Sequence, residues 1–150
     1  MDELLLALKS WQANTVVLYS TAQGFHWNVE GALFSQYHDF FGEIYADIYG
    51  TIDPIAEYQR KMQAQAPFTL SEMVSLNTYG DVSSPSNSPL IMSQILLLMI
   101  EKMIVEVKDL FDLASRSREQ GLANFAADRQ DKLQEWAWQL RSSIKSITSM

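Results

Sequence analysis

Apolar residues recur every three or four positions along most of the chain, which is the spacing that predicts amphipathic helices. Residues 2–26 form the first such segment and residues 34–63 the second. The apolar stripe of the second segment consists of Phe34, Tyr37, Phe41, Ile44, Ile48, Ile52 and Ile55. Pro54 lies inside this segment, where its missing backbone donor predicts a kink in one long helix.

A long connection, residues 64–88, follows the second helix. Thr69 and Glu72 have the spacing of a capping box, so the sequence TLSEMVSL predicts a short helix inside this connection. Ser88 and Pro89 are residue types preferred at the N-cap and the first position of a helix. A connection of this length also lets the third long helix run in the same direction as the second.

The third long helix is predicted to continue to about Gln120, with Gly121 as its C-terminal stop, and a fourth to cover residues 122–144. No segment shows the alternating pattern of a β-strand. We therefore predict a single all-α domain over residues 1–150. Four long helices with one long central crossover are the plan of the ferritin-like four-helix bundle, here with a short extra helix in the crossover.

The composition limits the chemistry and the partners. The 150 residues include no cysteine, which excludes disulfides, thiolate metal ligands and cysteine nucleophiles. The net charge of -7 and the pI of about 4.7 predict no direct DNA binding at physiological salt, because phosphate neutralisation supplies most of such affinity. The most apolar run, residues 90–100, is shorter than the roughly 20 residues that a membrane span needs. The first residues lack the pattern of a signal peptide, and we expect a cytoplasmic protein with no membrane partner.

Two histidines, His26 and His38, and a carboxylate pair, Asp53 and Glu57, are the candidate metal ligands. Imidazole together with carboxylate suits a first-row transition metal such as iron or zinc. On a helical wheel that starts at His38, Asp53 lies at about 60° and Glu57 at about 100°, on one face away from the apolar stripe. Along the axis, however, His38 and Asp53 are roughly 22 Å apart, so one chain cannot bring these ligands to one metal ion.

Two copies of the second helix that pack antiparallel across a two-fold axis would remove this obstacle. His38 of one copy would then lie beside Asp53 and Glu57 of the other, and each interface would hold two sites. His26, at the end of the first helix, would join His38 from its own chain. The spacing therefore predicts a metal site shared between two chains.

Small residues lie between the ligand positions, and Gly42, Ala46 and Gly50 fall on the same face of the wheel. Glycine inside a helix costs roughly 1 kcal/mol relative to alanine, so the two glycines need an explanation. Close approach of the backbone of a partner chain would be one, with the pairing of the two helices centred near Ala46. Each feature also has a simpler explanation: a hydrogen-bonded core histidine, a solvated Asp–Glu face, or tight packing. Because one arrangement accounts for all of them together, we favour the metal site.

The same residues carry a resemblance to a known family. The sequence HWNVEG at 26–31, His38 twelve residues after His26, and the Asp53-x-x-x-Glu57 pair resemble the Dps family, the miniferritins, and the resemblance covers nearly the whole chain. It implies a hollow dodecamer that oxidises Fe(II), preferentially with hydrogen peroxide rather than oxygen, and stores ferric mineral. It also implies ferroxidase sites between two-fold-related subunits, with both histidines from one and both carboxylates from the other, and leaves room for zinc as a competitor. Peroxide consumed in this way forms no hydroxyl radicals, so the implied role is protection against oxidative damage.

Further residues take their roles from the resemblance. Trp27 matches a tryptophan beside the site that passes electrons during oxidation. Acidic rings at three-fold pores admit iron in the family, and Asp128 and Asp131 are the candidates here, although a solvated helix face explains them equally well. Two positions depart from the pattern: Gly42 stands where members commonly carry a carboxylate, so the second iron position is expected to be weakly held, and Pro54 lies inside the carboxylate motif.

Two alternatives were compared with this prediction. A ferritin-like scaffold or assembly protein would keep the fold with weakened or lost ferroxidase activity; the four ligands argue against it, while Gly42 and Pro54 keep it open. An ordinary ferritin or bacterioferritin would need Glu-x-x-His pairs within one bundle. Gln23 and Ser35 stand three residues before the two histidines, which excludes that class.

Overall fold

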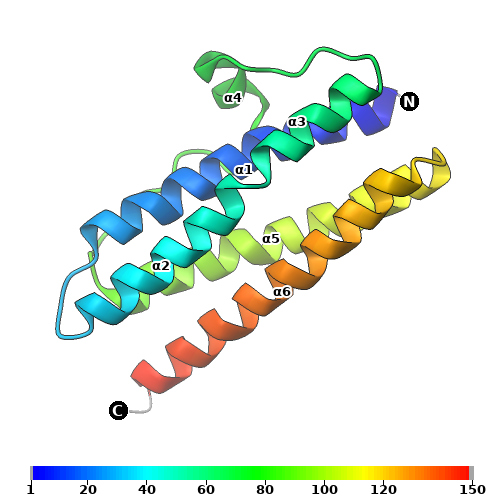
Figure 1. The fold of residues 1–150 in the computed structure, drawn as a ribbon. Helices are drawn as coiled ribbons and strands as arrows, with labels where there is room; N and C mark the ends of the chain where they lie inside the picture. Colours follow the sequence, from blue (N-terminus) through cyan, green and yellow to red (C-terminus); the bar gives the residue numbers. More distant parts are fainter. Residues whose placement is uncertain (1, 149–150) are drawn as a thin grey trace.

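The computed structural model of the chain describes residues 2–148, and within that range every regular element is a helix (Figure 1). The helices are α1 (Asp2–Asn28), α2 (Phe34–Tyr49), α3 (Ile52–Lys61), α4 (Leu70–Leu76), α5 (Pro89–Arg116) and α6 (Gln120–Thr148). The all-α prediction is confirmed. The capping box is confirmed as well, since the Thr69 hydroxyl accepts from the amide of Glu72 and the Glu72 carboxylate accepts from the amide of Thr69.

The long helices lie side by side as a bundle (Figure 1). α1 runs one way along the bundle, and α2 followed by α3 returns. The connection after α3 then carries the chain back, so that α5 runs in the same direction as α2 and α3, and α6 returns beside it. α1 packs against α2, α3 and α5, and α5 packs along α6. This arrangement is the predicted ferritin-like bundle with one long crossover.

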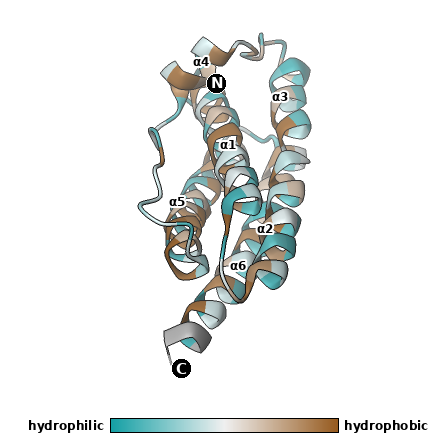
Figure 2. Ribbon diagram, turned by 90° about the vertical axis from the view of Figure 1, so that its left-hand side faces the viewer, coloured by the Kyte–Doolittle hydropathy of each residue, from teal (hydrophilic) through white to brown (hydrophobic). Residues whose placement is uncertain are grey.

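Each long helix has one apolar side, and the teal and brown residues in Figure 2 alternate along the ribbons as amphipathic helices require. The core formed by these sides contains Trp11, Phe41 and Ile100, all fully buried. Of the predicted stripe on the second helix, Phe34 is exposed at the start of α2 and Ile52 is only half-buried at the start of α3. No helix in the described part of the chain is long and apolar enough to cross a membrane.

The second predicted helix consists of two helices, so the prediction of one continuous helix was wrong. The interruption lies at Gly50 and Thr51, where the Thr51 hydroxyl donates to the carbonyl of Ile48 at 2.6 Å. Pro54 lies in the first turn of α3, a position where a helix needs no donor from its own backbone. The expected kink is therefore present as a break, and Pro54 helps to begin a helix rather than to bend one.

The turn between α5 and α6 also differs from the prediction. Arg118, not Gly121, takes the left-handed backbone conformation, with φ of 61°. Its amide donates to the carbonyl of Ser115 at 3.1 Å, and the next amide donates to the carbonyl of Ala114 at 2.9 Å. These bonds satisfy the last carbonyls of α5 and offset the cost of a left-handed arginine. Gly121 lies in the first turn of α6 instead.

Candidate metal centre

The two histidines lie next to each other at the end of the bundle where α1 leads into α2. His26 is in the last turn of α1 and His38 is in the second turn of α2. Residues 29–33 form a tight turn between the helices, anchored by the buried Val29 and containing Gly31 with φ of 121°. Only glycine adopts such a φ without strain, so the turn that brings the histidines together depends on it.

A backbone carbonyl of each histidine residue holds the ring of the other. The Nδ1 atom of His26 lies 2.5 Å from the carbonyl oxygen of His38, and the Nδ1 atom of His38 lies 2.7 Å from the carbonyl oxygen of His26. A carbonyl oxygen can only accept, so both Nδ1 atoms carry a proton and donate it. In a neutral ring the Nε2 atom then keeps its lone pair, which is the form of imidazole that binds a metal.

The two imidazole rings are stacked, with centroids 3.9 Å apart and planes inclined by 14°. Phe34 contacts the His38 ring at 5.0 Å between centroids, and Tyr45 contacts the His26 ring at 5.3 Å. Both histidines are half-buried. The hydrogen bonds and the aromatic neighbours together restrict rotation of both rings, so the pair is oriented before any metal arrives.

Asp53 and Glu57 lie one turn apart on α3, and both side chains are exposed. The other side of α3 buries Ile55 and Gln59 against the bundle, so the carboxylates face away from the core of their own chain. In the part of the chain that the structure describes, no three His, Asp or Glu side chains come together as a metal cluster. We call His26 and His38 the histidine half-site, and Asp53 and Glu57 the carboxylate half-site.

The other predicted site residues lie at the surface or beside the histidines. Trp27 follows His26 at the end of α1, and 65% of it is exposed. Asp128 and Asp131 are exposed on α6, in the half of that helix that follows the turn from α5.

The small residues of the predicted interface do not all have the same surroundings. Ala46 is exposed on α2, and Gly50 is exposed at the end of this helix. Gly42 is half-buried, and the space beside its Cα is filled by the ring of His26 from the same chain. Gly42 thus has an explanation within one chain that the sequence did not suggest.

A partly buried ion pair between α2 and α6 was not predicted. Arg129 donates two hydrogen bonds to the Asp47 carboxylate, at 3.0 and 2.8 Å, and the indole Nε1 of Trp136 adds a third at 2.8 Å. Burial raises the pKa of Asp47, but the hydrogen bonds and charge of Arg129 and the bond from Trp136 outweigh it, so this pKa lies below its ordinary value. The sequence did contain a sign of this ion pair, because the charged Arg129 occupies a core position of α6 between Ala126 and Leu133.

A second polar cluster, also not predicted, fixes the crossover to α1 and α5. The Asn14 side chain donates to Glu106 at 2.9 Å and accepts from the amide of Thr78 at 2.7 Å, while the Tyr79 hydroxyl donates to Glu106 at 3.3 Å. Burial raises the pKa of Glu106 to about 7, although the bonds from Asn14 and Tyr79 lower it; the charge of Asp109 raises it further.

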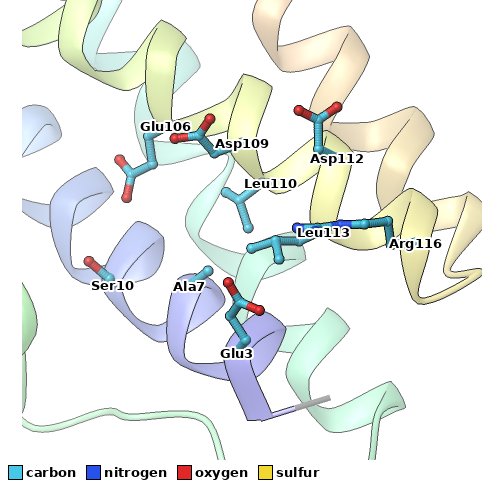
Figure 3. Close-up of a pocket in the computed structure, with 9 residues that line it drawn as sticks. All are labelled: Glu3, Ala7, Ser10, Glu106, Asp109, Leu110, Asp112, Leu113 and Arg116. Atoms are coloured by element: carbon cyan, nitrogen blue, oxygen red, sulfur yellow. The ribbon is translucent and has the colours of Figure 1, made fainter.

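A cleft of about 460 Å³ lies beside this cluster, between α1 and α5 (Figure 3). Its walls carry the carboxylates of Glu3, Glu106, Asp109 and Asp112 and the guanidinium of Arg116. Figure 3 shows that these carboxylates come from different turns of both helices and do not converge on one point. Neither histidine lines the cleft, so it is separate from the predicted metal site.

The chain has relatives of the same length and fold. It matches the Ferritin-like domain family over residues 5–150. The DNA protection during starvation protein of Helicobacter pylori is 31% identical over 140 residues, which cover 91% of this chain and 95% of the relative. The corresponding protein of Brevibacillus brevis is 25% identical over 146 residues, 97% of each chain. The crystal structure of a Dps protein from Vibrio cholerae O1, a member of a broad superfamily of ferritin-like diiron-carboxylate proteins, has a TM-score of 0.91 and 25% identity, and the match covers 96% of this chain and 90% of that one.

The helix bundle with one long central crossover has the architecture of the ferritin-like class. The chain belongs to the ferritin-like family and, within it, to the Dps proteins, as the resemblance predicted. In general terms this membership supports iron binding, ferroxidase-type chemistry, and a role in iron storage and protection.

Proposed function

We propose that this chain is a miniferritin that oxidises Fe(II) at sites formed between two of its copies. Fe(II) is the substrate, bound by the histidine half-site of one chain and by the carboxylate half-site of its two-fold partner. The observation that carries the proposal is the pair of reciprocal hydrogen bonds, which commits both Nδ1 atoms to carbonyl oxygens. Histidines that only filled a core would not need two fixed tautomers with both Nε2 atoms spared.

The exposed carboxylates supply the second part of the argument. Asp53 and Glu57 present one face of α3 to the outside while α3 itself is anchored in the bundle. Two imidazoles and two carboxylates form a donor set that suits iron, and zinc would compete for it. An antiparallel pairing of two chains across α2 and α3, centred near Ala46, would bring the two half-sites together twice.

In the proposed reaction each Fe(II) loses one electron, and hydrogen peroxide is the preferred oxidant over oxygen. One peroxide accepts two electrons and two protons to form two waters, so two Fe(II) ions are oxidised for each peroxide. Trp27, exposed beside His26, is proposed to pass electrons between the bound iron and the oxidant. The ferric product would be stored inside a hollow dodecamer, with Asp128 and Asp131 at the entry route for iron. The acidic surface attracts cations and opposes direct DNA binding.

The test is Fe(II) oxidation followed by absorbance, with peroxide and with oxygen in separate assays. His38→Ala is expected to lower the rate with peroxide at least about tenfold, because it removes one of the two imidazole ligands, while the backbone carbonyl that accepts from His26 remains. Asp39→Asn is the matched control, since it removes an exposed carboxylate from the next position of α2. Equal rates in the wild-type and His38→Ala proteins would refute the site.

The assembly is tested separately by size-exclusion chromatography with light scattering. The proposed site needs two chains and the proposed storage shell needs twelve, so the active species is expected to have the mass of a dodecamer. A stable monomer that oxidises Fe(II) at the wild-type rate would contradict the shared site.

A further inference from the structure

The turn of α2 that follows His38 carries no side chain toward the histidine half-site. Gly42 stands four residues after His38, and a Cβ atom there would lie 2.9 Å from Nδ1 and 3.0 Å from Cε1 of His26. Nδ1 is the atom that donates to the carbonyl of His38. The His26 ring therefore occupies the space that any side chain at position 42 would need.

From this contact we infer that Gly42 makes the proposed site a one-metal site, unlike the two-metal sites of diiron-carboxylate proteins; the inference rests on the proposed function. Ferritin-like diiron centres use four glutamates and two histidines to hold two ions. Each site here has two imidazoles from one chain and two carboxylates from its partner. Four side chains satisfy one first-row metal ion, with water completing its coordination.

A carboxylate at position 42 would do more than add a ligand, because it would also disturb the histidine half-site. A carboxylate at position 42 would reach the site from one turn beyond His38, but its own Cβ would meet the His26 ring. His26 would have to rotate away, and the bond from its Nδ1 to the His38 carbonyl would be lost. Gly42 therefore supplies no ligand to a second metal ion. Its lack of a side chain also leaves room for the ring of His26, which is a proposed ligand of the first ion.

The inference is tested by anaerobic titration of the assembled wild-type protein with Co(II), which binds such donor sets and is not oxidised under these conditions. Calorimetry and the visible spectrum count the ions, and His38→Ala gives the background. Since each chain contributes one histidine half-site, we expect one tightly bound ion per chain, absent in His38→Ala. Two ions per chain that both depend on His38 would overturn the one-metal inference and leave the proposed function intact. No binding above the background would overturn both.

A second measurement tests the role of Gly42 directly. Gly42→Ala is expected to raise the Kd for Co(II) at least tenfold, because the methyl group displaces the His26 ring. Gly24→Ala is the matched control: it lies two residues before His26, its Cβ would meet no atom within 4 Å, and its Kd is expected to stay within twofold of wild type. An assembled Gly42→Ala protein with the wild-type Kd would overturn the claim that Gly42 seats His26.

Discussion

α2 and α3 each bury one side against the bundle, but the chain attaches them to it by different kinds of polar contact. α2 is tied to α1 by the histidine pair and to α6 by the Asp47–Arg129 ion pair. α3 is tied to α1 by neutral groups, since Gln59 donates to Gln12 at 2.8 Å; Gln12 in turn donates to the carbonyl of Pro67, in the connection after α3, at 2.7 Å. The connection after α3 is held through Glu106, whose partners Asn14 and Tyr79 are uncharged.

This difference matches what each helix contributes to the proposed site. Imidazole binds a metal only through a nitrogen that points in the correct direction, so the histidine half-site needs its helix and its rings to be fixed. The carboxylate half-site lies on exposed turns of α3 and has two equivalent oxygens per group, so it needs position more than orientation. Charge pairing is used on α2, where the geometry has to be most exact, and neutral hydrogen bonds suffice for α3.

The largest effect is expected when the histidine half-site is disabled in one variant and the carboxylate half-site in another. His38→Ala and Glu57→Gln are each expected to abolish most Fe(II) oxidation as pure proteins, because every site loses a ligand. Chains unfolded and refolded together as an equal mixture should regain about a quarter of the wild-type activity, since random two-fold pairing rebuilds one intact site in each mixed pair. The measurement is the peroxide-dependent rate of the mixture against both pure variants.

The control is a mixture of His26→Ala with His38→Ala chains, both altered in the same half-site. Random pairing of these two chains leaves no intact site, so no activity should return. Recovery of activity in this control, or none in the first mixture, would contradict a site shared between two chains.

The next largest effect concerns the charged anchor of α2. Arg129→Met leaves the Asp47 carboxylate half-buried without its cation, and we expect the free energy of unfolding to fall by about 2–4 kcal/mol. Glu135→Gln breaks the exposed pair with Lys132 at 3.5 Å and should cost less than about 0.5 kcal/mol. Urea unfolding at one fixed protein concentration measures both, because assembly shifts the apparent stability of an oligomer. Similar losses in the two variants would mean that the Asp47–Arg129 pair stabilises the fold no more than an exposed pair within α6 does.

Local patterns predicted the helices well, because periodicity and caps act over a few residues. The capping box at Thr69 and the helix start at Ser88 and Pro89 are present as predicted. The break at Thr51 and the left-handed Arg118 were not predicted, since both depend on backbone hydrogen bonds that residue types do not specify. The break also means that wheel angles taken from His38 across Gly50 and Thr51 to Asp53 describe a continuous helix that does not exist.

The site was predictable in its residue types but not in its contacts. His26 and His38 lie together as the spacing suggested, because a short turn joins their helices. The reciprocal bonds could not be read from the sequence, since they depend on the conformation of residues 29–33 and on which ring nitrogen faces which carbonyl. Gly42 was assigned to the interface because its intrachain neighbour, His26, is close only in three dimensions.

A further effect, which depends on pH, is expected from Glu106, a half-buried carboxylate whose hydrogen-bond partners Asn14 and Tyr79 are uncharged. Its pKa is about 7 in the folded chain, above its ordinary value of 4.5, so the folded state binds the proton more tightly than the unfolded state. The associated stability is present below about pH 4.5 and is lost as the pH rises to about 7, by about 3 kcal/mol in total. Asp47 behaves in the opposite way, because its pKa is lowered in the folded chain. Its contribution to stability is present at pH values above its ordinary pKa and is lost only as the pH falls into the acid range.

Glu106→Gln removes this titration while keeping an oxygen that accepts from Asn14. The variant should therefore show a flatter dependence of unfolding free energy on pH between 5 and 7, and should be more stable than wild type at pH 8. Asp109→Asn is the comparison variant, because Asp109 is exposed and contributes only a secondary charge effect. A wild-type slope in Glu106→Gln would mean that the crossover anchor does not titrate in this range.

The smallest effect is expected at the neutral anchor of α3. Gln59→Met removes the donor to the Gln12 side chain and leaves a buried acceptor without its partner, at a cost of about 1–2 kcal/mol. Replacing both glutamines by methionine removes the mismatch as well as the bond, so the double variant should lose less than the sum of the two single variants. A double-mutant cycle in urea measures the coupling. If Gln59→Met cost as much as Arg129→Met, α3 would be as tightly held as α2, and the carboxylate half-site would be as rigid as the histidines that it is proposed to meet.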